Sequence, residues 1–258
     1  MASRHSAFYS PLLATIGRGF DASYSVLKAG QRTQDLIREG VVDIMQSAVS
    51  SNWKPMDRGE APLPVHFALI NRRDGFFIAA PEADDAFSWK KLEGRSLHAD
   101  RGEQPMAMLR YALAYNGVDW DKIHVVESGD ADYIHRQAPG KWRHVASVGA
   151  SMPEVAFSTL CCSRDFICTP AYKEFFEAYV EAREWVQSAA PEDVAAVEAR
   201  FFHEVSHNDL ADSIEAYQKL GNWTGGTEID DGLYDQALTV FGRSTGLATR
   251  HPRASVCL

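Results

Sequence analysis

Strand-like and helix-like segments alternate along the first two thirds of the chain, and this order constrains the fold more than any single motif. Amphipathic spacing predicts helices at 10–17, 32–40 and 105–117, the second of them closed by Gly40. Short runs rich in β-branched and aromatic residues predict strands at 23–27, 41–47, 64–70, 75–80, 122–128, 132–137, 143–149 and 154–162. Such alternation favours a mainly parallel α/β sheet.

The last third of the chain has a different pattern, which predicts helices at 171–188, 191–203, 207–220 and 230–242. One connection is too short for a parallel pair of strands. Only "GDA" separates 122–128 from 132–137, whereas a parallel crossover needs about a dozen residues. Either these two strands form a hairpin, or a segment is missing from the sequence there. The link "GRGFDASYS" after the first helix is similarly short.

Composition limits the class of protein and its partners. A chain of 258 residues can form one large domain or two smaller lobes. Its net charge of −9, from 26 basic and 35 acidic residues, argues against a nucleic-acid partner. No apolar run approaches the roughly 18 residues of a membrane helix. The four cysteines, Cys161, Cys162, Cys168 and Cys257, are expected to be buried free thiols.

The start of the chain leaves the compartment open. Met1 leads directly into polar residues, without the apolar core of an export signal. The protein is therefore expected to be periplasmic if a signal peptide was removed, and cytoplasmic otherwise.

Four stretches carry a family resemblance: "SRHSAFYSPLLATI", "LIREGVVDIMQSAVSS", "LEGRSLHADRGEQPMAMLRYAL", and "VAFSTLCCSRDFI" with the following "AYKEFFEAYVEAREWV". In this order and spacing they resemble the periplasmic solute-binding proteins of ABC importers. The most similar branch covers alkanesulfonate, taurine, nitrate and thiamin-pyrimidine ligands. The resemblance extends over nearly the whole chain, although each motif alone is weak.

The resemblance implies a two-lobed α/β fold of the periplasmic-binding-protein type II, with two hinge crossings and a helical C-terminal tail. Lobe one would be 1–78 plus 160–258, and lobe two 79–159. The crossings would be "GFFIAA" and "EVAFSTL". Two departures from the relatives stand out. They carry a full strand before the segment matching "SRHS" and a helix where this chain has only "GDA".

The segment "SRHSAFYS" is the first candidate wall of a ligand site. Ligands of open α/β sheets lie beyond the carboxyl ends of strands, where helix N-termini present free N–H groups. Ser3, Ser6 and His5 would hydrogen-bond a ligand there, and Phe8 and Tyr9 would stack on it. In the alternative interpretation, Ser6 or Ser10 only caps the helix and the aromatic residues enter the core.

Three further segments complete the predicted site. From lobe one, the loop "QSAVSS" would contribute Gln46, Ser47 and Ala48. From lobe two, Gly102 would allow close backbone approach and Gln104 would hydrogen-bond from the helix entry. Alternate residues of the strand "DYIHRQ" would share one face, which suits either a pocket or a half-exposed sheet. The remaining candidates are Tyr133, His135, Gln137, Asp74 and Ser158, the last two at the crossings, where Phe77 and Phe157 are expected to be core residues.

Three other patterns are given less weight. His203 and His207 are four residues apart, but no further zinc ligand is evident. The glycine-rich "GNWTGG" at 221–226 follows a helix instead of a strand, so it is not a phosphate loop. "CCSRDFIC" loosely resembles a cysteine-rich segment of fungal thiamin-pyrimidine synthases.

The leading functional prediction is a substrate-binding protein of an ABC transporter. It would capture a small polar or anionic solute, sulfonate-, nitrate- or pyrimidine-like, in an interlobe cleft. A small-molecule ligand and a transporter permease would be its partners, the protein would be a monomer, and no cofactor or metal is expected. The alternative is a thiamin-pyrimidine-synthase-like enzyme using pyridoxal phosphate, with Lys54 or Lys90 forming the Schiff base. A non-catalytic cytosolic sensor with the same cleft is a third reading.

Overall fold

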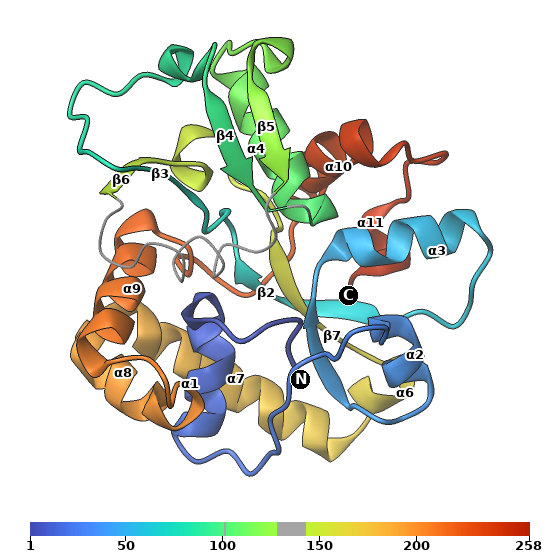
Figure 1. Ribbon diagram of the computed structural model, residues 1–258. Coiled ribbons are helices and arrows are strands. Elements are labelled where there is room, and N and C mark those ends of the chain that lie inside the picture. Colours follow the sequence, from blue (N-terminus) through green and yellow to red (C-terminus); the bar gives the residue numbers. More distant parts are fainter. Residues whose placement is uncertain (101, 128–142) are drawn as a thin grey trace. The chain divides into compact units, whose positions relative to one another are not determined.

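The computed structural model describes residues 1–100, 102–127 and 143–258. The chain forms two compact units, each with its own α/β architecture (Figure 1). Unit 1 consists of Met1–Arg73, Val155–Ala237 and Leu247–Leu258. Unit 2 consists of Asp74–Glu154 and Leu238–Gly246.

Unit 1 is built on a three-stranded sheet in the order β1–β7–β2. The central strand pairs antiparallel with both neighbours, and its Cys161 lies opposite Met45 on one side and His66 on the other. All residues of β2 and β7 are buried, as the apolar run "VHFALI" predicts for a strand covered on both faces. The strands are β1 (Ile44–Ser47), β2 (Val65–Asn71) and β7 (Ser158–Cys162).

The N-terminal residues extend this sheet beyond β1. Met1 O accepts a hydrogen bond from Gln46 N at 2.8 Å, and Ala2 forms a parallel bridge with Val26. A second parallel bridge joins His66 of β2 to Cys257 near the C-terminus. Met1 N also donates to Ile44 O, so the first residues run parallel to β1. The segment after Ala2 and the loop after β1, the two predicted ligand segments of this unit, therefore begin at the same edge of the sheet.

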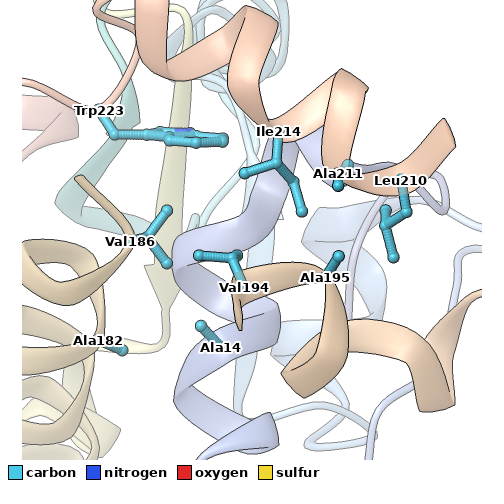
Figure 2. Packing of buried hydrophobic residues seen from close by; sticks show 10 residues of the cluster. Ala14, Ala182, Val186, Val194, Ala195, Leu210, Ala211, Ile214 and Trp223 are labelled. Carbon is cyan, nitrogen blue, oxygen red and sulfur yellow. The ribbon is translucent and has the colours of Figure 1, made fainter. Parts of the chain in front are cut away.

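Helices α1, α7, α8 and α9 pack together in unit 1 around an apolar cluster that includes Val186, Ile214 and Trp223 (Figure 2). Hydroxyl caps begin two of these helices. Thr169 Oγ1 accepts from Tyr172 N at 3.2 Å, and Ser206 Oγ accepts from Asp209 N at 3.1 Å. The helical elements of this unit are η1 (Ala7–Tyr9), α1 (Ser10–Gly17), α2 (Thr33–Arg38), η2 (Val49–Asn52), α3 (Trp53–Asp57), α6 (Arg164–Ile167), α7 (Pro170–Ser188), α8 (Pro191–Glu198), η6 (Ala199–Phe201), α9 (His207–Leu220) and α11 (Arg253–Val256).

Unit 2 contains two strand pairs. β3 (Phe77–Ala80) pairs antiparallel with β6 (Arg143–Ser147). β4 (Ser96–Ala99) pairs parallel with β5 (His124–Glu127), and α4 (Glu103–Tyr115) is their crossover helix. The short 3₁₀ helices are η3 (Trp89–Leu92), η4 (Trp120–Lys122) and η5 (Gly149–Ser151). Helix α10 (Asp231–Thr245) begins in unit 1, and its C-terminal half belongs to unit 2.

The helices predicted from the sequence are confirmed, including α1 and the helical last third. The expectation of a mainly parallel sheet is wrong, because β4 and β5 are the one parallel pair among the described strands. The chain re-enters unit 1 through β7 after Asp74–Glu154, the first segment of unit 2, so no helical crossover fixes the direction of that strand. The predicted strand at 23–27 is reduced to the bridge at Val26, and the predicted strand at 132–137 lies outside the described residues.

The two units differ from the expected lobes in their bounds. The divisions fall after Arg73 and Glu154, five residues before the expected ones. The expected all-helical tail of lobe one is also divided, because Leu238–Gly246 packs with unit 2. Among the described residues, no helix is long and apolar enough to cross a membrane.

The cysteines follow the expectation with one exception. Cys161, Cys162 and Cys257 are buried free thiols, and burial is the main cause that raises the pKa of each. Cys168 is free but exposed, because it lies just after the short helix α6 and ahead of α7.

The last residue of α8, Glu198, carries a buried carboxyl group that faces Ser10 at the start of α1. Glu198 is fully buried, and its Oε1 has no hydrogen-bond partner. Ser10 Oγ lies 2.7 Å from Ala7 O and 3.1 Å from Glu198 Oε2. Because one hydroxyl proton cannot serve both oxygens, the second hydrogen bond requires a protonated Glu198. Burial accordingly raises the pKa of Glu198 to about 8.

This carboxyl group should make stability depend on pH. The pKa of Glu198 is higher in the folded than in the unfolded chain, so the folded state holds the proton more tightly. Stability is therefore lost as the pH rises from about 4.5 to about 8. We expect Glu198→Gln to match the wild type near pH 4 and to be more stable at pH 9, by on the order of a few kcal/mol, in urea unfolding. The exposed neighbour Glu192→Gln should show no such divergence; equal behaviour of the two variants would contradict the assignment.

Candidate functional site

Residues from three separate parts of the sequence meet at the edge of the unit 1 sheet. Ser3 N and Ser3 Oγ both donate to Gln46 Oε1, at 2.9 and 2.6 Å. Ser3 Oγ lies 3.3 Å from the Tyr9 hydroxyl, and Ser158 at the start of β7 is close enough to lower the pKa of that phenol. We call Ser3, Tyr9, Gln46 and Ser158 the serine–tyrosine cluster. The sequence predicted each of them as a ligand-site residue, and the structure brings these four together.

The hydrogen bonds of this cluster have a defined direction. Gln46 Oε1 is only an acceptor, so it takes the single Ser3 hydroxyl proton. Tyr9 must then donate to Ser3 Oγ. Burial raises the pKa of Tyr9, so its phenol keeps the proton that this order needs. The cluster is therefore an ordered polar network.

The outer rim of the cluster is the segment Ser3–Arg4–His5, in which all three residues are exposed. The charge of Arg4 lowers the pKa of Tyr9, in opposition to burial, which raises it. The His5 ring packs edge-on against Phe202, with ring centroids 4.5 Å apart. Sequence reasoning missed Arg4. Its position between Ser3 and His5 was the signal that could have found it.

The remaining residues of the first segment have structural roles. Ser6 Oγ accepts from Phe8 N at 3.1 Å and caps η1. Phe8 and Tyr9 are 6% and 5% exposed, and the Phe8 ring packs against Phe157. The alternative interpretation therefore holds for these two residues: Ser6 caps a helix, and Phe8 is a core aromatic residue. Phe157 is a core residue, as expected.

The loop "QSAVSS" after β1 presents backbone N–H groups, while the Ser47 hydroxyl is used within the loop. Ser47 Oγ donates to Ser51 Oγ at 3.1 Å, so its hydroxyl proton is used within the loop. Ala48 is the N-cap residue of η2 and provides no side-chain cap. The first N–H groups of η2 are thus left without a capping side chain. A ligand role for Ser47 and Ala48 stays a prediction.

In unit 2, the candidate residues that the structure describes occupy two places. Asp74 is fully buried; its Oδ1 accepts from Phe76 N, its Oδ2 has no partner, and burial raises its pKa to about 7. The backbone of Gly149 lies so close to Asp74 that a Cβ would sit 2.2 Å from Asp74 O. Gly102 caps α4, with its N–H bonded to Asp100 Oδ1 at 2.7 Å, and Gln104 is in the first turn. Tyr133, His135 and Gln137 lie outside the described residues.

The described residues contain no group of three side chains that could hold a metal ion, and this includes the surroundings of His203 and His207. His66 is buried in the same sheet, with Nδ1 2.7 Å from Thr159 Oγ1. Burial lowers the pKa of His66 to about 3, so the ring is neutral. The arrangement at the edge of unit 1 offers hydrogen bonding and one positive charge to a ligand.

Comparison with known proteins identifies the fold. No protein-family model matches the chain. Two solved structures of sulfonate-binding proteins are similar to it. The periplasmic aliphatic sulphonate binding protein SsuA of Escherichia coli matches with a TM-score of 0.66 at 13% identity, over 96% of this chain and 88% of that one. The alkanesulfonate-binding protein SsuA of Xanthomonas axonopodis pv. citri, bound to MOPS, matches with a TM-score of 0.65 at 11% identity, over 100% of this chain and 96% of that one. The CA3427 gene product of Candida albicans, whose structure is described as a generic periplasmic binding protein fold, matches with TM-score 0.53 at 13% identity, over 100% of this chain and 94% of that one.

This chain has the periplasmic-binding-protein fold. A sequence relative agrees with it. YtlA of Bacillus subtilis, named provisionally as a binding protein, is 22% identical over 278 aligned positions, which cover 96% of this chain and 83% of the relative. At these identities the likeness shows the fold alone, and all three of these relatives are called binding proteins by name.

The ordered network predicts a cost for removing the Tyr9 hydroxyl. Tyr9→Phe leaves Ser3 Oγ without its donor, while the ring still fills its buried site. We expect about 1–3 kcal/mol less stability in urea unfolding. Tyr115→Phe, at a tyrosine 59% exposed, should change stability much less. A Tyr9→Phe protein as stable as the wild type would show that the network contributes nothing to folding.

Proposed function

We propose that the chain is the substrate-binding component of an ABC-type import system and that it binds a small anionic organic solute of the sulfonate type. It would release this solute to a transporter permease. In this proposal the rim Ser3–Arg4–His5 contacts the solute, and the serine–tyrosine cluster holds the rim in place.

The observation that carries the proposal is the convergence of Ser3, Tyr9, Gln46 and Ser158 at the edge of the sheet, next to an exposed arginine. A guanidinium matches the oxygen atoms of a sulfonate well, because its N–H groups are fixed in one plane. The fixed acceptor Gln46 holds the Ser3 backbone, so little order is lost when a solute binds there. The names of the structural relatives support the same class of solute.

The enzyme alternative gains no support from the residues considered for it. Lys90 Nζ lies 2.8 Å from Glu93 Oε1 in an exposed ion pair. A Schiff-base lysine instead works from a desolvated pocket. The relatives found by structure are binding proteins by name.

Titration calorimetry tests the proposal with MOPS, short alkanesulfonates, nitrate and a pyrimidine as probes. We expect one sulfonate to bind with a Kd below about 100 μM, equivalent to about −5.5 kcal/mol. Arg4→Met should weaken that binding by about tenfold or more, because the charge-assisted hydrogen bond is lost. The exposed Lys173→Met has the same change of charge on α7 and should bind as the wild type does.

Two results would contradict the proposal. One is that no probe binds below about 100 μM. The other is that Arg4→Met and Lys173→Met lower the affinity equally, because the effect would then be one of net charge and not of the rim.

A further inference from the structure

The chain enters unit 2 at Asp74 and leaves the first segment of that unit at Glu154. One hydrogen bond within each unit joins the two stretches of chain that cross here. These bonds run from Val148 N to Phe76 O at 3.0 Å in unit 2, and from Val155 N to Arg72 O at 2.9 Å in unit 1. Between the two bonds, residues 73–75 lie opposite the longer stretch 149–154, so regular strand pairing cannot continue through this place. We call residues 73–75 and 149–154 the crossing bulge.

The backbone of the longer stretch packs directly on Asp74. Gly149 lies so close that a Cβ on it would be 2.2 Å from Asp74 O and 2.9 Å from Asp74 N. Any larger residue at this position would push the two stretches apart. On its other side, η5 is held by α4, because Asn116 Nδ2 donates to Ser151 O at 3.3 Å. The packing of Gly149 on Asp74 therefore depends on the close approach of two backbones.

The Asp74 carboxyl group is enclosed in this packing. Asp74 is fully buried; its Oδ1 accepts from Phe76 N, and its Oδ2 has no hydrogen-bond partner. A carboxylate that is shielded from water needs several donors, so one N–H group leaves the charged form poorly stabilised. Burial accordingly raises the pKa of Asp74 to about 7, in opposition to the hydrogen bond from Phe76 N, which lowers it.

Other groups that can carry charge near neutral pH lie on the segments around Asp74. They are Arg72, Arg73 and Glu154 on the two crossing stretches, Arg143 and His144 on β6, and Arg110 on α4. The three on β6 and α4 are exposed, and the three on the crossing stretches are half-buried and have partners of their own. The strand β3 and the turn η5 carry no titratable side chain. Within the crossing bulge, Asp74 is therefore the fully buried titratable group.

We propose that Asp74 is a pH-sensitive switch for the crossing bulge. While the carboxyl group is protonated, residues 149–154 stay packed on Asp74. When the carboxyl group gives its proton to water, its charge must be hydrated, and residues 149–154 separate from Asp74 while α4 stays folded. Because the bulge lies where the chain passes between the two units, its opening gives that connection more freedom to bend. The switch does not depend on the proposed transport role, since it concerns the backbone of unit 2 whatever solute the protein binds.

Amide hydrogen exchange, followed by mass spectrometry between about pH 5.5 and pH 9 and corrected for intrinsic exchange rates, tests the proposal. The pKa of Asp74 is higher in the packed state than the ordinary value of 3.8, so the packing is fully stabilised below that value and weakens as the pH rises through about 7. We expect peptides covering 147–156 to lose protection above pH 7, by up to about tenfold per pH unit. Peptides of α4 should keep their protection, because the opening is local.

Variants assign the effect to one group. Asp74→Asn keeps the shape and the acceptor for Phe76 N but cannot ionise, so its protection at 147–156 should not change with pH. Asp85→Asn, at an exposed aspartate of the same unit, should behave as the wild type does. Gly149→Ala should lose protection at 147–156 at every pH, because its Cβ would collide with Asp74.

Three results would overturn the switch. One is a wild-type protection at 147–156 that does not change between pH 6 and pH 9. Another is an equal loss in Asp74→Asn, because a different group such as His144 would then be responsible. The third is an equal loss in the peptides of α4, because the unit would then unfold as a whole instead of opening at the crossing bulge.

Discussion

The pairing of β7 with both β1 and β2 is the constraint on which unit 1 depends. β7 enters the sheet after Asp74–Glu154, the first segment of unit 2, and its residues satisfy the backbone groups of two strands far away in sequence. Because every residue of β7 is buried, leaving its N–H and C=O groups unpaired would be costly. The same strand begins at Ser158, so the sheet register that completes the core also delivers the last member of the serine–tyrosine cluster.

Local signals were sufficient to predict the helices. Capping residues, proline at the first position of α7 and glycine after α9 act within a few residues, and the structure follows them. Strand direction was not predictable in this way. A parallel sheet was inferred from alternation, yet the central strand is antiparallel, because its direction depends on how the chain returns from unit 2. The bridge at Val26 shows the same limit: one pair of residues contacts Ala2 where a strand was expected.

The sequence was sufficient to predict which segments of unit 1 come together, but not which hydrogen bonds their side chains form. The first segment, the end of β1 and the start of β7 lie together, and the contact of these segments with a ligand stays a prediction. Ser3 is tied to Gln46, whereas Ser6, three residues later, only caps a helix. Ligand contact itself follows from neither the sequence nor these hydrogen bonds, so it rests on the binding experiments. The burial of Arg183 was not predictable for a different reason. Its neighbours in the sequence of α7 are charged residues, which are typical of a solvent-exposed helix face, and it is buried by tertiary packing.

Phe8 connects η1 to two other parts of unit 1. Its carbonyl oxygen accepts from Asn71 Nδ2 at 2.9 Å and from Trp223 Nε1, while its ring packs on Phe157. Asn71 is the last residue of β2 and pairs with Ser158 across the sheet, next to the serine–tyrosine cluster. Two hydrogen bonds to one carbonyl oxygen therefore tie η1 both to the end of β2 and to the loop "GNWTGG", which carries Trp223.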